Sequence, residues 1–190
     1  KLLDLHRGKY GNYDCIVPGS GGKDSCYAAH ILKYKYGMNP LTVTWPPILY
    51  TDYGLKNFNN WLSSCKLDNI SAKRDENTMK MLTKLSIVNL MHPFQTFMLG
   101  QKIFASKIAI KYKIPLVFFG ENEAEHGNPI ADNATSLRNK SYFTYRNINN
   151  LYLGGVKIND LIANYNIKFN NLKIFLPLSE NEILNNNIQV

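Results

Sequence analysis

The sequence predicts an α/β protein built on a doubly wound parallel sheet, with helices on both faces of the sheet. Short apolar runs alternate with amphipathic stretches between residues 13 and 119, which is typical of parallel strands joined by helical crossovers. The first apolar run ends at a glycine-rich turn, at the position where such sheets bind ligands. With 190 residues, of which 45% are apolar, the chain is long enough to build a buried core.

The first elements form a strand–helix–strand unit. Residues 13–18 read Y-D-C-I-V-P, a short apolar run that suits a buried strand and stops at proline. Residues 25–36 place apolar side chains at helical spacing, and Gly37 stands where a left-handed residue ends many helices. Residues 41–45, L-T-V-T-W, are rich in β-branched side chains and precede two prolines, so we expect a second strand.

The alternation continues along the next part of the chain. Residues 52–64 have one apolar face and predict an amphipathic helix, and a brief strand is expected at 69–72. Further helices are expected over 75–90, which a His-Pro pair follows, and over 97–113. Residues 114–119, I-P-L-V-F-F, are almost wholly apolar and predict a central strand that is buried on both faces.

The C-terminal part is rich in asparagine and tyrosine. We expect an α/β domain over residues 1–133 and a C-terminal extension over 134–190, which would be the start of a second region in a longer polypeptide. Within the extension the sequence predicts a helix near 151–165, a strand at 173–176 and the entry to another helix at 177–182.

Composition narrows the class of protein. The chain has 22 basic and 14 acidic residues and a formal net charge of +8, but the lysines are scattered and form no block, so we do not expect a nucleic-acid partner. No apolar run reaches about eighteen residues and no secretory leader is apparent, so we expect a cytoplasmic protein without a membrane span. The three cysteines form no CxxC pair and the four histidines show no metal-ligand spacing, so we expect free thiols and no metal bound by histidine or cysteine.

The stretch between the first strand and the first helix carries the clearest chemical signal. It reads S-G-G-K-D-S, in which glycines let the backbone approach a ligand while N–H groups of the helix N-terminus face the same point. The pattern differs from a Walker A loop, where Ser or Thr follows the lysine. A carboxylate is unfavourable there unless a cation bridges it to phosphate, so we expect Asp24 to bind Mg²⁺; an ordinary turn with Asp24 stabilising the helix N-terminus is the alternative. The candidate phosphate-binding residues are Ser20, Gly21, Gly22, Lys23 and Ser25.

A second polar segment follows the most apolar run. Residues 120–127 read G-E-N-E-A-E-H-G and hold three of the 14 acidic residues, Glu121, Glu123 and Glu125. In an extended conformation these carboxylates would project to one side, and a strand exit would bring them toward the glycine-rich turn. They could bind Mg²⁺, orient sugar hydroxyls or take a proton from an attacking nitrogen, and a solvated acidic turn is the alternative.

The S-G-G-K-D-S stretch resembles the S-G-G-x-D-S signature of the PP-loop ATP pyrophosphatases. The resemblance implies the adenine nucleotide alpha hydrolase-like fold, cleavage of ATP between its α and β phosphates, and a substrate that is adenylated on oxygen. It also implies that the loop holds the pyrophosphate and that Thr44, Trp45 and Gly120 lie at the nucleotide. Packing of the indole beside the following prolines is an equal alternative for Trp45.

Over residues 14–133 the order of these elements, with G-E-N-E-A-E-H-G, is similar to the N-acetyl sugar amidotransferases, PP-loop enzymes of bacterial surface-glycan and lipopolysaccharide biosynthesis. The resemblance implies an enzyme that adenylates the acetamido oxygen of an N-acetylated sugar and lets ammonia replace AMP, which gives an acetamidino sugar. ATP and Mg²⁺ would be the cofactors. Lys23 and Asp24 would act at the phosphates, and Glu121, Glu123 or Glu125 at the sugar or the ammonia. His126 is a weaker candidate for a proton acceptor.

The cysteines and the net charge bear on the source of ammonia and on alternative functions. No cysteine lies in a nucleophile context with a histidine partner, so we expect a separate glutaminase subunit as a partner. One rival is a PP-loop enzyme that thiolates or amidates a tRNA base, which the net charge favours and the missing CxxC pair opposes. The other rival is a non-catalytic ATP-binding module.

Overall fold

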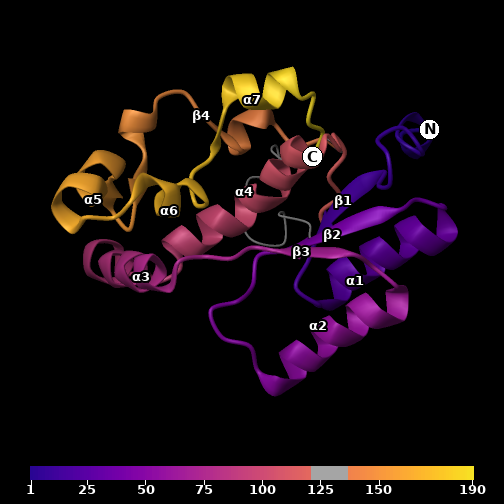
Figure 1. Ribbon diagram of the computed structural model, residues 1–190, viewed down its shortest axis with the longest axis horizontal. Helices are drawn as coiled ribbons and strands as arrows, with labels where there is room; N and C mark the ends of the chain where they lie inside the picture. The colour runs from indigo at the N-terminus through magenta and orange to yellow at the C-terminus, as the bar shows by residue number, and fades with distance from the viewer. Residues whose placement is uncertain (121–136) are drawn as a thin grey trace.

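A computed structural model describes residues 1–120 and 137–190 and shows a parallel sheet with helices around it (Figure 1). The elements before residue 120 are β1 (Cys15–Pro18), α1 (Lys23–His30), β2 (Pro40–Thr44), α2 (Asp52–Cys65), β3 (Asn69–Ser71), α3 (Glu76–Leu90) and α4 (Gln95–Tyr112). Those after residue 137 are β4 (Thr144–Tyr145), β5 (Tyr152–Leu153), β6 (Val156–Lys157), α5 (Ile158–Tyr165), α6 (Phe169–Lys173), β7 (Leu178–Ser179) and α7 (Glu180–Asn185).

The main sheet has three regular strands in the order β1-β2-β3, and all of them are parallel. Ile16 of β1 pairs with Leu41 of β2, and Val43 of β2 pairs with Ile70 of β3. Every residue of β2 is buried, as expected for a strand with neighbours on both edges and side chains packed on both faces. The α/β class and the strands predicted near 13–18, 41–45 and 69–72 are therefore confirmed.

Residues 114–119 extend this sheet beyond β1, on the edge away from β2. The N–H of Ile16 donates to the carbonyl of Leu116 at 2.8 Å, and the N–H of Phe118 donates to the carbonyl of Ile16 at 2.8 Å. On its other edge the segment pairs with Gln189 near the C-terminus. The predicted central position is confirmed, but the pairing on both edges consists of isolated bridges rather than a regular ladder.

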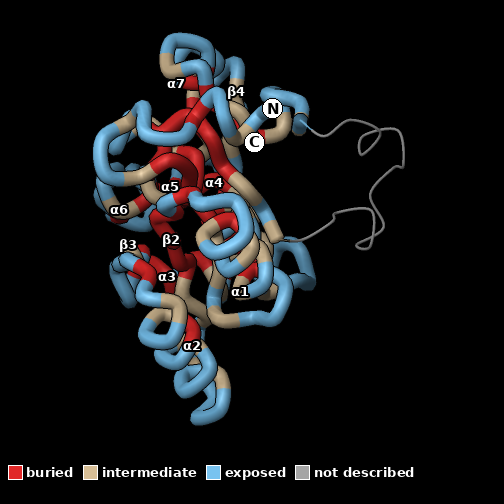
Figure 2. The backbone as a smooth tube through the Cα atoms, turned by 90° about the vertical axis from the view of Figure 1, so that its right-hand side faces the viewer, coloured by how far each residue is buried: buried red, intermediate tan, exposed pale blue. Residues whose placement is uncertain are grey.

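Two apolar clusters lie on the two faces of the sheet. Alternate residues of β1 point to opposite sides, since Ile16 belongs to the cluster under α3 and α4 and Val17 to the cluster under α1 and α2. Figure 1 shows α1 and α2 on one side of the strands and α4 on the other, and Figure 2 shows the buried strands enclosed by exposed outer helical turns. Helices therefore cover both faces, and the winding of the chain reverses beside β1.

The helix ends follow capping chemistry. Thr51 and Asp75 precede α2 and α3, and each side-chain oxygen accepts the backbone N–H three residues further on, as N-caps do. The helix predicted at 25–36 begins earlier, at Lys23, and its second half is a π-helical turn over Ile31–Lys35. Gly37 then adopts a left-handed φ of 63°, as its position predicted.

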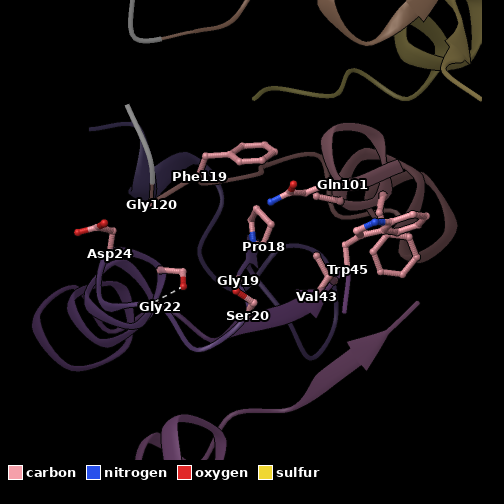
Figure 3. Close-up of a pocket in the computed structure, with 13 residues that line it drawn as sticks. Pro18, Gly19, Ser20, Gly22, Asp24, Val43, Trp45, Gln101, Phe119 and Gly120 are labelled. Carbon is pink, nitrogen blue, oxygen red and sulfur yellow. Dashed lines mark hydrogen bonds between the residues drawn. The ribbon is translucent and has the colours of Figure 1, made fainter. Parts of the chain in front are cut away.

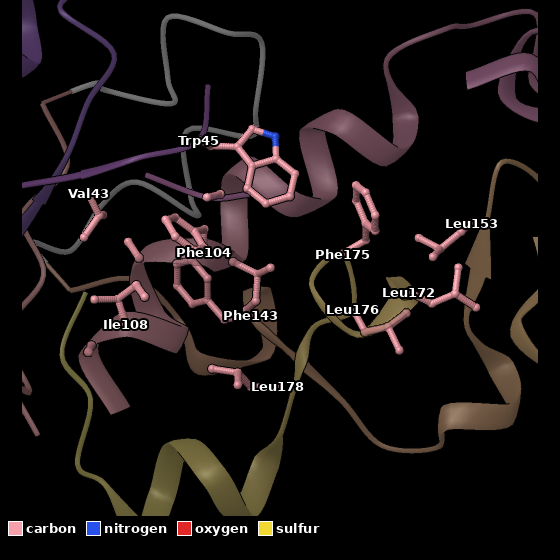
Figure 4. Packing of buried hydrophobic residues seen from close by; sticks show 14 of the residues in the cluster. Val43, Trp45, Phe104, Ile108, Phe143, Leu153, Leu172, Phe175, Leu176 and Leu178 are labelled. Atoms are coloured by element: carbon pink, nitrogen blue, oxygen red, sulfur yellow. The ribbon is translucent and has the colours of Figure 1, made fainter. Parts of the chain in front are cut away.

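The described C-terminal residues add to the core that α4 covers. Buried side chains from this part belong to the same apolar cluster as the α4 residues Phe104 and Ile108 (Figure 4). The ring of Phe175 is fully buried and meets the indole of Trp45 edge-on at 5.6 Å. The Lys107 ammonium of α4 donates to two backbone carbonyls at the end of α6, which ties the two parts together.

Two predictions for this part are corrected and one is confirmed. The helix near 151–165 comprises only α5, because Gly154 and Gly155, both with positive φ, turn β5 back onto β6. The strand predicted at 173–176 is wrong, since α6 ends there and the following residues form a turn whose Phe175 side chain fills the core. The helix entry at 177–182 is confirmed by α7 and its capping box.

Candidate functional site

A glycine loop, residues 20–25, joins β1 to α1 at the carboxyl end of the sheet. Gly21 has a φ of +90°, a backbone conformation that residues other than glycine rarely adopt. A Cβ on Gly21 would also fall 2.7 Å from the Cα of Phe58 in α2. Gly22 is the N-cap of α1 with extended backbone, and the helix begins at Lys23. The loop conformation therefore requires glycine at Gly21, and it leaves the first N–H groups of α1 directed at its mouth.

The glycine loop is held from both sides. Ser25 is only 8% exposed, and its hydroxyl donates to the carbonyl of Gly22 at 3.0 Å. On the other side, the Gly19 N–H donates to the carbonyl of Val43 at 2.9 Å, and the Thr44 hydroxyl donates to the Gly19 carbonyl at 2.7 Å. The end of β1 is thus fixed to β2 directly before the loop begins.

Gly120 brings the end of the 114–119 segment against the same helix start. A Cβ on Gly120 would lie 2.7 Å from the backbone nitrogen of Ser25 and 2.8 Å from the carbonyl carbon and oxygen of Asp24. Backbone atoms in a helical first turn move little, so only glycine fits this approach. Gly120, the last residue described before the gap, therefore lies beside the glycine loop.

A pocket opens where these segments meet (Figure 3). The empty space between its walls is about 640 Å³, a figure that includes open solvent at the mouth. It lies between the ends of β1 and the 114–119 segment, where the winding of the sheet reverses, and sheets of this kind bind ligands at that point. The lining residues are Pro18, Gly19, Ser20, Gly22, Asp24, Ser25, Val43, Trp45, Gln101, Phe104, Ala105, Phe119 and Gly120.

The pocket gathers part of the predicted site. Ser20, Gly22, Asp24, Ser25, Trp45 and Gly120 line it. Gly21 and Lys23 belong to the loop but do not line it; Lys23 is exposed at the start of α1. Thr44 is fully buried and does not line the pocket. Its hydroxyl donates to the Gly19 carbonyl and accepts from the Asn69 side-chain amide at 2.9 Å, so it fixes the backbone directly before the loop. Glu121, Glu123, Glu125 and His126 lie outside the described residues.

Trp45 forms the far wall of the pocket. Its residue is 6% exposed, and its indole packs against three phenylalanine rings at centroid distances of 5.6 to 6.3 Å. The Arg74 guanidinium lies 5.0 Å from the indole centroid, and one of its nitrogens donates to the Pro47 carbonyl at 3.3 Å. Burial lowers the pKa of Arg74. The indole is thus both core packing and pocket wall.

Asp24 fits a magnesium ion that is held mainly by phosphate. Its carboxylate is exposed, lines the pocket, and has no hydrogen bond or ion pair to the rest of the described chain. Across residues 1–120 and 137–190, no three carboxylate, histidine or cysteine side chains come together as a metal site. One carboxylate with phosphate oxygens and water is a common ligand set for Mg²⁺, whereas zinc prefers several protein ligands.

The lining residues from α4 were not among the sequence-predicted site residues. Gln101, Phe104 and Ala105 recur at i, i+3 and i+4, so one face of α4 contributes all of them. The signal available in the sequence was a glutamine inside an otherwise apolar helical face. It could be recognised only after the helix was placed over the carboxyl end of β1.

Two of the three cysteine side chains have a raised pKa and are therefore poor nucleophiles. Burial, together with the charge of Asp14, raises the pKa of the Cys15 thiol to about 12. Burial also raises the pKa of Cys26, and the charge of Cys65 adds to this. All three thiols are free.

Comparison of the sequence with models of protein families found no match, and comparison with curated proteins found none with significant similarity. Among the helices of the described residues, none is at once long enough and apolar enough to cross a bilayer.

Proposed function

We propose that the chain is an ATP pyrophosphatase of the PP-loop type, with the adenine nucleotide alpha hydrolase-like fold, which activates an N-acetylated sugar for amidation. The observation that carries the proposal is the glycine loop, which opens into a pocket at the point where the winding of the sheet reverses. The S-G-G-K-D-S sequence of this loop and the G-E-N-E-A-E-H-G segment that begins beside it support the sugar amidotransferase reading.

The loop has the groups needed to hold pyrophosphate. The backbone N–H groups at Gly21 and Gly22, the first N–H groups of α1 and the Ser20 hydroxyl can donate to phosphate oxygens. Lys23 supplies a positive charge from a flexible stem. Mg²⁺, bound by Asp24, would neutralise charge on the phosphates as the pyrophosphate leaves.

The chemistry explains the need for ATP. An amide carbon is a poor electrophile, and its oxygen is a poor leaving group. Attack of the acetamido oxygen on the α-phosphorus forms an O–P bond, breaks the bond to the β-phosphate and releases pyrophosphate. Ammonia then adds to the activated carbon, AMP leaves with its oxygen, and the acetamidino group remains after loss of a proton. The protein would contribute mainly by positioning the reactants and neutralising charge.

The nitrogen would come from another protein. Burial raises the pKa of the Cys15 and Cys26 thiols, so neither supplies an activated thiolate of the kind that glutamine hydrolysis uses. We therefore propose a separate glutaminase subunit as partner. Glu121, Glu123 or Glu125 would orient the sugar or accept the proton from ammonia.

One rival function has an observation in its favour. The net charge of +8 suits a PP-loop enzyme that modifies tRNA. Binding of tRNA in a filter assay distinguishes the two, because binding driven by phosphate contacts must fall steeply as salt is raised. Tight binding with that dependence would favour the tRNA enzyme, and its absence would favour the sugar enzyme.

The direct test is release of pyrophosphate. Purified protein with ATP, Mg²⁺ and ammonium chloride is offered a panel of N-acetylated sugars, free and nucleotide-linked, and pyrophosphate and AMP are measured. We expect sugar-dependent release of both, with Lys23→Ala and Asp24→Asn each slowing it by about 100-fold or more. Lys84→Ala, which removes an exposed lysine on α3 outside the pocket, serves as the control. Release that neither loop variant affects would exclude the assignment of the loop, and nucleotide binding without any release would favour a non-catalytic ATP-binding module.

A further inference from the structure

The pocket has two chemically different ends. At the glycine loop it offers Asp24, serine hydroxyls and backbone N–H groups. At the other end the walls are apolar and aromatic, formed by Val43, Trp45, Phe104 and Ala105, and Pro18 and Phe119 lie between the two ends (Figure 3). Asp24 is the only lining residue with a formal charge among those described. The far end therefore suits a neutral, flat, apolar group rather than a second phosphate.

One polar side chain enters this apolar end. The Gln101 amide reaches from α4 toward Pro18 and the ring of Phe119 (Figure 3). Gln101 is exposed, and its amide has no hydrogen bond to another described residue. It lies on the same helical face as Phe104 and Ala105, which are buried against the sheet, so a rigid helix fixes its Cα position.

We propose that Gln101 reads the purine base of the bound nucleotide and selects adenine. This inference rests on the proposed function, since it requires the triphosphate to lie in the glycine loop. A glutamine amide presents one acceptor and one donor side by side, and adenine offers the matching amino donor at N6 and acceptor at N7. Guanine presents acceptors at both O6 and N7, so the amide oxygen would face another acceptor. The apolar walls, with the 37% exposed ring of Phe119 beside Gln101, would cover the base faces (Figure 3).

Calorimetric titration in the presence of Mg²⁺ tests this with three probes. ATP carries both base groups, 7-deaza-ATP lacks the N7 acceptor, and inorganic tripolyphosphate lacks the base. We expect wild-type protein to bind 7-deaza-ATP about 10-fold more weakly than ATP. In Gln101→Leu we expect ATP to bind about 10- to 100-fold more weakly, with ATP and 7-deaza-ATP now equal. Tripolyphosphate should bind equally well to both proteins, and because Gln101 is exposed their melting temperatures should agree.

The outcomes separate this inference from the proposed function. If wild-type protein binds neither ATP nor tripolyphosphate, the assignment of the loop fails and the inference falls with it. If both bind but Gln101→Leu keeps the preference for ATP over 7-deaza-ATP, the loop assignment stands and the reading of the base is overturned. It is likewise overturned if Gln101→Leu leaves ATP affinity unchanged and raises only the KM for the sugar, because the amide would then contact the acetamido group.

Discussion

Replacing Gly100 by alanine tests how closely α4 packs against Trp45 in the pocket wall. Gly100 lies in the middle of α4, and the place of its missing side chain is taken by the six-membered ring of Trp45. A Cβ there would fall 2.8 Å from Cε2 of the indole and closer still to Cζ2 and Cη2. Phe97, Phe104 and Phe175 pack against the indole and limit how far it can shift.

Two opposing effects decide the sign of the change in stability. Alanine in a helix interior is favoured over glycine by about 1 kcal/mol. Overpacking of a filled core costs about 1 to 3 kcal/mol, and so close a contact belongs at the upper end. We therefore expect Gly100→Ala to lower the free energy of unfolding by about 1 to 2 kcal/mol. In a Trp45→Leu background the obstacle is gone, so the same substitution should raise it by about 1 kcal/mol.

The wild type, the two single variants Gly100→Ala and Trp45→Leu, and the double variant form a double-mutant cycle. Urea unfolding of these four proteins, followed by far-UV circular dichroism, measures the effect of Gly100→Ala on the free energy of unfolding in each background. The coupling energy between the two positions should be about 2 to 3 kcal/mol. Circular dichroism is the appropriate probe because one of the two tryptophans is itself substituted. If Gly100→Ala stabilised the wild-type protein, or if the two substitutions were additive, the close packing of α4 on Trp45 would be refuted.

Two helix caps give further predictions. Thr51→Ala should lower the free energy of unfolding by about 1 kcal/mol in the same urea assay, because it removes the acceptor for the Gly54 N–H, while Thr51→Ser should retain it. Hydrogen bonds from Thr78, through its side chain first and then its backbone, hold the pKa of Asp75 below its ordinary value. The stability that this carboxylate adds is therefore present above its unfolded pKa and is lost as the pH falls below that value and through the lower folded pKa. Acid titration of stability should show wild type losing stability relative to Asp75→Asn in that range, and parallel curves would contradict this.

The strand–loop–helix unit was predictable because its signals are local. The apolar run of β1, the two glycines and the periodicity of α1 lie within a short stretch, and each favours the conformation that is observed. The position of the 114–119 segment was predictable for a similar reason, since almost every side chain in it is apolar. Its pairing on the outer edge was not, because that depends on an isolated bridge to Gln189 far along the chain.

Other features depended on contacts that the sequence does not display. A strand and a core-filling turn have the same apolar composition at 173–176, and only the placement of Phe175 against Trp45 distinguishes them. Thr44 ends β2 as expected, yet its hydroxyl turns to the Gly19 carbonyl instead of the pocket. Gln101 joins the site through the angle at which α4 crosses the sheet, which no local pattern specifies.

The glycine loop is shaped by the protein itself. Cβ atoms on Gly19 and Gly21 would lie 2.7 Å from Trp61 and from the backbone of Phe58, so α2 presses on the loop at two points. On the opposite side Gly120 closes on the first turn of α1 at a comparable distance. A loop confined in this way presents its N–H groups without first being ordered by a ligand, and this reduces the entropic cost of binding. The clustering of glycines around the loop is thus explained by close packing, and the loop conformation does not depend on a bound ligand.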